Sequence, residues 1–396
     1  MARLFEGDDF RNMCLLGQVQ GFKVGRWDGS GRHSRVGHLP CAGDEEMSSP
    51  KNLEASAVPA AFFRAGGRGI PYSRGMPIFD LPLAQLETYE GRNPRPADFD
   101  EYWERAMAEL AATDPKPELV ANHSLKARHA ECFDLWFTGV GGARIYVKYV
   151  RPRGATQKLP AVLQFHGYSA NSGDWRNKLS LSSEGFCVAA MDCRGQGGRS
   201  EDPGGVMGMT LRGHIVRGLD DPDPDKLAFR QIFLDTVQLA RVVRRFDEVD
   251  PARVGTSGAS QGGALALACA ALVPEIRRVV AVYPFLCDYE RVWEMDLAKN
   301  AYEELRYYFR LFDPRHERES EVFTKLGYVD CQFLAPRIRA EVMFFTGLMD
   351  EICPPSSQFA AYNKITSPKK MIIYPDYGHE AMPDAGDLEM NYMSGL

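Results

Sequence analysis

A glycine-rich stretch, residues 255–263 with the sequence GTSGASQGG, constrains the fold of this chain more than any other segment. A short apolar segment before it is typical of a buried strand, and the small apolar residues 264–272 after it are typical of a helix. Between them lies a G-x-S-x-G pentapeptide centred on Ser260. A sharp corner between strand and helix exposes a serine hydroxyl, and Gly258 and Gly262 have no Cβ that would hold the two elements apart. We therefore interpret Ser260 as a nucleophile; in the alternative interpretation it only caps the helix.

Short segments rich in Val, Ile and Phe alternate with helical segments along much of the chain. The strands expected from this pattern are residues 161–165, 186–191, 253–256, 278–283, 341–346 and 370–374. The clearest helix, residues 227–246, places Ile232, Leu239 and Val243 on one face. The alternation predicts an α/β fold with a mostly parallel central sheet flanked by helices. In such a sheet the site lies at the carboxyl ends of the strands, where Ser260 is expected.

Two parts of the chain differ in composition. Residues 1–75 are rich in Gly, Arg and Ser without a sustained helix or strand period, so we expect a low-order N-terminal extension of unknown role. A regulatory arm is the alternative. Residues 76–396 are expected to form one domain, which opens with a helix that ends near Leu110 and continues with a hairpin of residues 131–138 and 144–149.

The overall composition narrows the classes of partner. With 44% apolar residues, 25% charged residues and a formal net charge of −6, the chain has the composition of an ordinary globular protein. The net charge gives no reason to expect a nucleic acid or an anionic membrane as partner, so a small neutral substrate fits better. No apolar run reaches the roughly eighteen residues of a membrane span, and the first thirty residues do not resemble a secretory signal.

The cysteines predict a reduced compartment. The chain has nine of them, with no C-x-x-C pair and no Cys/His cluster at zinc spacing, so we expect free thiols in a cytoplasmic protein and no metal site. Cys193 and Cys353 lie beside motifs discussed below. We expect both to fill small buried spaces rather than to react.

A nucleophilic serine needs a general base, and only two histidines follow Ser260 in the chain. His316 stands in a polar helical run and is expected at the surface. His379 follows the expected strand 370–374 after a short turn, which places it at the same rim of the sheet as Ser260. We therefore expect His379 to be the base.

The imidazole in turn needs an acid that orients it. Asp350 follows the expected strand 341–346 and is our prediction for this role. Asp376, three residues before His379, is the main competitor, although its loop would have to fold back on itself. Asp330 and Asp192 are weaker candidates.

The negative oxygen of a tetrahedral intermediate needs hydrogen-bond donors fixed in advance. One expected donor is the backbone N–H of Gln261, the residue after the nucleophile. The second is the backbone N–H of Tyr168, in the loop that follows the expected strand 161–165. Tyr168 is also a candidate for the wall of the acyl pocket, and His166 is expected to support this loop without acting as base.

Three separated motifs together resemble a known family. They are RGQGG at residues 194–198, GASQGG at residues 258–263 and Gly-His-Glu at residues 378–380, and the resemblance extends through residues 213–220 and covers about residues 76–396. This set is similar to carbohydrate esterase family seven, the acetyl xylan esterases and cephalosporin C deacetylases of the α/β-hydrolase superfamily. The resemblance implies an α/β-hydrolase fold with an added interface insertion, no metal or organic cofactor, and hydrolysis of acetyl groups from small acetylated substrates such as xylo-oligosaccharides and cephalosporin C.

The resemblance also implies roles for individual residues. The family triad falls on Ser260, Asp350 and His379, and its oxyanion donors fall on Tyr168 and Gln261. The narrow acyl pocket of the family would involve Tyr168, Pro284 and Ile352, and Arg194 of the RGQGG motif would brace loops around the site.

The resemblance also implies an oligomeric state. Family members form homo-oligomers, usually hexamers with inward-facing sites that exclude polymers, and the N-terminal extension of this chain departs from that pattern.

Two alternatives to a serine esterase remain at this point. One is a peptidase or dienelactone-type hydrolase on the same triad, and the other is a non-catalytic binding module with an α/β-hydrolase fold.

Overall fold

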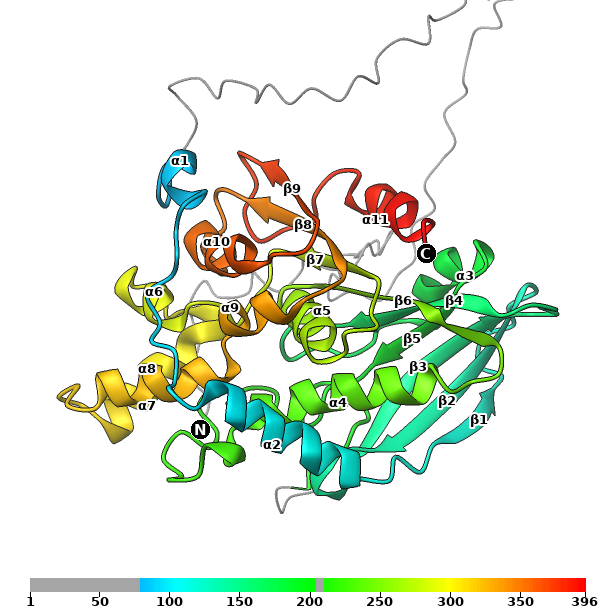
Figure 1. The fold of residues 1–396 in the computed structure, drawn as a ribbon, viewed down its shortest axis with the longest axis horizontal. Helices are drawn as coiled ribbons and strands as arrows, with labels where there is room; N and C mark the ends of the chain where they lie inside the picture. Colours follow the sequence, from blue (N-terminus) through cyan, green and yellow to red (C-terminus); the bar gives the residue numbers. More distant parts are fainter. Residues whose placement is uncertain (1–78, 204–209) are drawn as a thin grey trace, which may run out of the picture. The chain divides into compact units, whose positions relative to one another are not determined.

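The computed structural model describes residues 79–203 and 210–396, all of which belong to one compact unit, Ile70–Leu396 (Figure 1). The N-terminal extension expected at residues 1–75 lies outside the described residues. The unit is built on a nine-stranded sheet with the order β1-β2-β3-β5-β4-β6-β7-β8-β9. This mostly parallel sheet, covered by helices, confirms the expected α/β-hydrolase class of fold.

The first strands are antiparallel and the others parallel. The strands are β1 (Glu118–Asn122), β2 (Ala130–Thr138), β3 (Arg144–Pro152), β4 (Leu159–Phe165), β5 (Cys187–Met191), β6 (Val249–Ala259), β7 (Arg278–Val282), β8 (Glu341–Gly347) and β9 (Lys369–Tyr374). β3 pairs antiparallel with β2 and with β5, and from β5 across to β9 every pairing is parallel. The parallel strands therefore all end at one rim, where the site was expected.

Helices lie on both faces of this sheet. They are α1 (Leu83–Leu86), α2 (Phe99–Ala112), α3 (Leu179–Ser183), α4 (Ala228–Val243), α5 (Gln261–Leu272), α6 (Tyr289–Glu294), α7 (Glu303–Phe312), α8 (Glu319–Leu326), α9 (Cys331–Leu334), α10 (Pro355–Lys364) and α11 (Ala385–Met393). Figure 1 shows α2, α4 and α5 below the sheet and α3 and α11 on its other side. None of the described helices has both the length and the apolar character needed to cross a membrane.

Alternate residues of each strand face opposite sides of the sheet, so the core is divided into a cluster on each face. In β4, Leu163 and Phe165 face the large hydrophobic cluster under α4 and α5, whereas Val162 faces the smaller cluster under α3 and α11. Both faces are apolar because both are covered, which explains the nearly continuous apolar runs of the parallel strands. Helix α5 is buried along its whole length, so the element that follows Ser260 is enclosed by protein.

The structure corrects several expected boundaries. β1 was not expected, because four of its five residues are exposed and it shows no alternation of apolar and polar positions. β6 begins at Val249, earlier than the expected residue 253, and a register shift in its pairing with β4 accompanies the added residues. The hairpin is confirmed, with Thr138 opposite Arg144, and Gly141 has the positive φ of 71° that the turn requires.

Candidate active site

Ser260 lies at a strained corner between β6 and α5. Its φ of 57° and ψ of −121° are unfavourable for a residue with a side chain. A Cβ at Gly258 would come within 2.4 Å of the Gly262 backbone, and one at Gly262 within 2.1 Å of the Phe165 carbonyl oxygen. Only glycine therefore permits this close approach at either position. The Ser260 N–H donates to the Val282 carbonyl at 2.9 Å, which ties the corner to the neighbouring strand β7.

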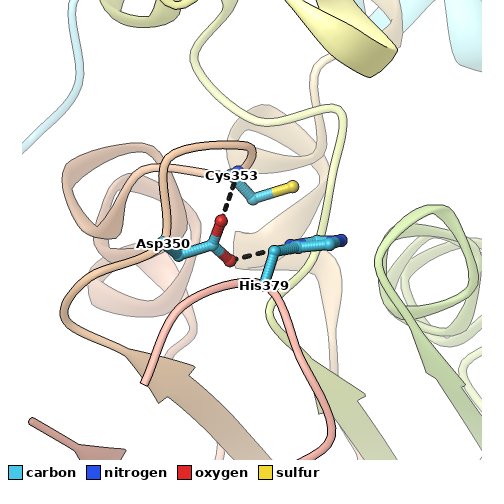
Figure 2. Close-up of side chains that lie close together, drawn as sticks. All are labelled: Asp350, Cys353 and His379. Carbon is cyan, nitrogen blue, oxygen red and sulfur yellow. Dashed lines mark hydrogen bonds and ion pairs between the residues drawn. The ribbon is translucent and has the colours of Figure 1, made fainter. Parts of the chain in front are cut away.

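Asp350 and His379, predicted as acid and base, are brought together from separate strand ends (Figure 2). Asp350 follows β8 and is fully buried, and His379 follows β9. The His379 Nδ1 lies 2.8 Å from the Asp350 Oδ2, so a proton on Nδ1 leaves Nε2 free to accept another. The His379 ring also lies 4.4 Å from the Tyr283 ring, centroid to centroid, and Tyr283 directly follows the Val282 that holds Ser260.

The Asp350 carboxylate is oriented by several donors. Its Oδ1 accepts the backbone N–H groups of Ile352 at 2.9 Å and Cys353 at 2.8 Å. Its Oδ2 accepts from His379 and, at 3.4 Å, from the Gln358 Nε2. The two carboxylate oxygens therefore have different partners and cannot exchange places freely. Gln358 carries no motif, and its role was not foreseen from the sequence.

Cys353 lies beside the proposed triad as a buried thiol. Burial and the Asp350 charge raise the pKa of Cys353 well above its usual value, although contact with the Ser260 hydroxyl lowers it. A thiol with a raised pKa is a poor nucleophile. Candidate ligand atoms of Asp350, Cys353 and His379 lie within 4.8 Å of one another. Both Asp350 oxygens and the His379 Nδ1 are already in hydrogen bonds, so the set suits proton transfer better than a cation.

Gln196, from the RGQGG motif, contacts one of the two expected oxyanion donor residues, Gln261, and the residue that follows the other, Tyr168. Gln261 is the first residue of α5, where a backbone N–H has no partner within the helix. Its side chain forms amide contacts with Gln196 at 2.7 Å and 3.0 Å. The Gln196 Oε1 also accepts the backbone N–H of Ser169 at 3.0 Å. Within residues 79–203 and 210–396, neither the Tyr168 N–H nor the Gln261 N–H has a hydrogen-bond acceptor.

His166 supports the oxyanion loop through both of its ring nitrogens. Its Nδ1 lies 2.8 Å from the Gly167 carbonyl oxygen, and its Nε2 accepts the Cys193 N–H at 2.9 Å. This pairing requires the neutral tautomer with the proton on Nδ1, and burial lowers the pKa of His166. A histidine with both nitrogens engaged in this way is a structural element of the loop.

The RGQGG motif also anchors the rim through Arg194. The Arg194 side chain is buried and forms two hydrogen bonds with Asp235 of α4, at 2.7 Å and 2.6 Å, and two with the Val140 carbonyl oxygen at 3.2 Å. A planar guanidinium with a bidentate partner holds the motif in one orientation.

The competing candidates lie in other surroundings. His316 is exposed and pairs with Glu319 at 3.1 Å. Asp376 is exposed, and none of its atoms is among the hydrogen-bond partners of His379 in the described chain. Asp330 accepts from Gln332 and from the Asp288 N–H.

Asp192 is likewise engaged elsewhere, because it accepts the backbone N–H groups of Ser172 and Arg199.

The residues expected in the acyl pocket border the proposed catalytic groups. Pro284 is buried between Tyr283 and Phe285, and Ile352 is half-buried beside Asp350.

Comparison with known proteins agrees with this geometry. A family model described as acetyl xylan esterase matches residues 76–396. Acetyl esterase Axe7A of Xylanibacter ruminicola is 25% identical over 306 residues, which are 75% of this chain and 66% of that relative, so the chain spans slightly less than two thirds of its length. The crystal structure of acetyl xylan esterase 1 from Thermoanaerobacterium sp. JW/SL YS485 is 60% identical, with a TM-score of 0.77 over 80% of this chain and 99% of that one. The acetyl xylan esterase from Paenibacillus sp. R4 is 34% identical, with a TM-score of 0.75 over 80% of this chain and all of that one.

Proposed function

The chain belongs to the acetyl xylan esterase family and is a carboxylic ester hydrolase, and we propose that it removes acetyl groups with Ser260, His379 and Asp350 as its triad. The observation that carries this proposal is the 2.8 Å hydrogen bond between His379 Nδ1 and Asp350 Oδ2, in the same compact unit as the strained Ser260 corner. A base that is oriented by a buried acid and a serine that is held at a strained strand-to-helix corner are the groups that nucleophilic acyl transfer needs.

The proposed reaction has two halves. The Ser260 Oγ attacks the acetyl carbonyl carbon while the His379 Nε2 takes the hydroxyl proton, and the Tyr168 and Gln261 N–H groups hold the negative oxygen. The intermediate collapses, His379 returns the proton to the leaving alcohol, and an acetyl-enzyme remains. Water, deprotonated by His379, then attacks the acetyl group and releases acetate and free Ser260. Asp350 holds the imidazole in one tautomer throughout and keeps its own negative charge.

A short acyl group is the substrate feature most open to test. The proposed pocket wall consists of Tyr168, Pro284 and Ile352, whose bulky side chains are proposed to limit the length of the acyl chain. We expect kcat/KM to fall on the order of tenfold or more from p-nitrophenyl acetate to the butyrate and again to the octanoate, because steric exclusion of extra methylenes is worth about 1–3 kcal/mol. Equal or faster turnover of the octanoate would contradict the narrow pocket.

The finer substrate assignment rests on the family resemblance. We expect acetate release from short acetylated xylo-oligosaccharides and from cephalosporin C, by a hexamer in the cytoplasm whose inward-facing sites exclude intact xylan. Native mass measurement would give the oligomeric state. Acetate release from oligosaccharides and from the polymer, compared at equal acetyl content, would test exclusion, and equal rates would contradict it.

Gln358 offers a test of how the Asp350 carboxylate is held. We expect Gln358→Ala to lower kcat about threefold to tenfold and the free energy of unfolding by about 1–3 kcal/mol, because the Cys353 carbonyl and Asp350 each lose a buried donor. Gln238→Ala is the matched control, since Gln238 of α4 donates to the backbone carbonyls of Thr113 and Thr138 and lies outside the site. Both unfolding and kcat are measured for each variant. A similar fall in kcat in both would reduce the role of Gln358 to general stability.

A further inference from the structure

Helix α7 reaches the oxyanion loop through a contact that the proposed mechanism does not use. The Tyr168 hydroxyl donates to the Glu304 carboxylate, and the Tyr168 ring packs against Phe285 with ring centroids 5.5 Å apart. Glu304 is half-buried at the start of α7, more than one hundred residues from Tyr168 along the chain. The inference drawn from this contact rests on the proposed function, because it concerns the hole that Tyr168 is proposed to form.

Glu304 and Tyr168 together accept hydrogen bonds from a row of backbone N–H groups. Four consecutive N–H groups, those of residues 213–216, converge on the Glu304 carboxylate and the Tyr168 hydroxyl oxygen. The bonds are Gly213 to Oε1 at 3.2 Å, His214 to the Tyr168 hydroxyl at 3.0 Å, and Ile215 and Val216 to Oε2 at 2.8 Å and 3.2 Å. A concave row of backbone N–H groups is an anion-binding arrangement, and here the anion is a side chain of the protein itself. This gives a role to the 213–220 motif, which the proposed mechanism leaves without one.

Ionisation of Glu304 is set by opposing influences. Burial raises the pKa of Glu304, while the Tyr168 hydroxyl and the backbone N–H groups of this row lower it. Burial and the neighbouring Glu304 charge also raise the pKa of Tyr168, so the phenol keeps its proton and acts as donor. The contact is therefore a hydrogen bond from a neutral phenol to a carboxylate, which is stronger than one between two neutral groups.

The backbone on each side of the Tyr168 N–H is already fixed. The Gly167 carbonyl oxygen is held by the His166 Nδ1 and by the Ala170 N–H at 3.1 Å. In a trans peptide the carbonyl and the next N–H point in opposite directions, so the Tyr168 N–H points away from these partners. The following residue, Ser169, is held by Gln196 and has a positive φ of 62°. The side chain of Tyr168 is the remaining free element, and Glu304 fixes it.

We propose that Glu304 is a positioning residue of the oxyanion hole, which acts through the Tyr168 hydroxyl to hold the Tyr168 N–H where the carbonyl oxygen becomes negative. Donors of this kind stabilise the transition state only when they are fixed in advance, because reorientation during the reaction offsets their contribution. Loss of the Glu304 contact leaves the N–H in place but less firmly positioned, because the side chain of the residue that carries it is no longer held, and a displacement of about 1 Å is enough to slow a reaction up to roughly a hundredfold.

The variants Tyr168→Phe and Glu304→Gln, with their double variant, test this. Tyr168→Phe keeps the ring and its packing and removes only the hydroxyl. We expect kcat for p-nitrophenyl acetate to fall about tenfold to a hundredfold in each single variant, with KM changed less than about threefold, because the hole acts mainly on the transition state. In the double variant we expect kcat within about threefold of the lower single variant, since both substitutions affect the same hydrogen bond.

A thionoester substrate provides a rate ratio that would not change if Glu304 and the Tyr168 hydroxyl only stabilised the fold. Sulfur in place of the carbonyl oxygen is a weak hydrogen-bond acceptor, so a thionoacetate depends little on the hole. We expect the ratio of ester to thionoester kcat to fall in Tyr168→Phe and Glu304→Gln. The matched controls are Tyr308→Phe and Glu303→Gln on the same helix, which lose contacts with Asp220 and with Arg212 and Tyr307, and they should keep this ratio and kcat within about twofold.

The possible results separate the two proposals. All rates are normalised to the protein fraction labelled by a fluorophosphonate at Ser260, and thermal unfolding is measured for each variant. A wild-type protein without turnover or label would overturn the esterase mechanism itself. With an active wild type, a kcat within about twofold of normal in both single variants would overturn the role of Glu304. So would an unchanged ester-to-thionoester ratio in variants whose kcat has fallen.

Discussion

Replacing Ser260 by alanine is expected to lower kcat for p-nitrophenyl acetate by about 10⁴-fold or more, because no other group in the site can form the acyl-enzyme. The neighbouring thiol does not substitute for it. Burial and the Asp350 charge raise the pKa of Cys353, so the thiolate needed for attack is scarce at neutral pH. The variant should also fail to react with a fluorophosphonate probe.

Ser257→Ala is the matched control for this prediction. Ser257 lies on β6, the strand that leads to Ser260, and its hydroxyl donates to the half-buried Glu389, which is not part of the proposed triad. We expect this control to lose stability and to keep kcat within about threefold of the wild-type value, because it removes a hydrogen bond outside the site. Near-full activity in Ser260→Ala, with an intact fold, would remove Ser260 as nucleophile.

The rim at the carboxyl ends of the parallel strands was the most predictable part of the molecule, because few local structures are compatible with the sequence there. Gly258 and Gly262 are required by two backbone approaches that no side chain could tolerate. The positions of Asp350 and His379 follow from parallel strands, which bring residues distant in sequence to a common edge. Short apolar runs that end in a polar residue therefore predicted both the fold and the contact between Asp350 and His379.

The supporting residues were much less predictable. Glu304 and Gln358 make their proposed supporting contacts with residues outside their own helices, and a glutamate or glutamine in a helix has no distinguishing sequence pattern. The short helices from α6 to α9 were not delimited from the sequence, since they are fixed by packing rather than by propensity. β1 was missed because an exposed edge strand needs no apolar alternation.

Gln196 illustrates the same limit within a recognised motif. RGQGG was expected to be structural, and Arg194 has the buried, bidentate partner Asp235 that such a role requires. The sequence did not indicate that Gln196 contacts both the Gln261 side chain and the Ser169 N–H. A glutamine that links two loops can be recognised only when both loops have been placed.

Asp350→Asn is expected to lower kcat about 10⁴-fold near neutral pH, because it would place the His379 proton on the wrong nitrogen. The hydrogen bonds of Asp350 determine how asparagine would sit. Its Oδ1 position receives two backbone N–H groups, so the amide oxygen must occupy that position and the amide NH₂ must face the imidazole. His379 Nδ1 would then accept a hydrogen bond from the amide, which leaves the proton of the neutral ring on Nε2. An Nε2 that carries a proton cannot take one from Ser260.

The exposed competitor Asp376 provides the control for this substitution. Asp376→Asn should keep kcat within about twofold of the wild-type value, since its side chain lies at the surface. Thermal unfolding separates a tautomer effect from a loss of fold, because the asparagine variant retains the shape of the side chain and its two backbone donors. If Asp376→Asn caused the larger loss, the acid of the triad would be Asp376, and the hydrogen bond between His379 and Asp350 would have a structural role only.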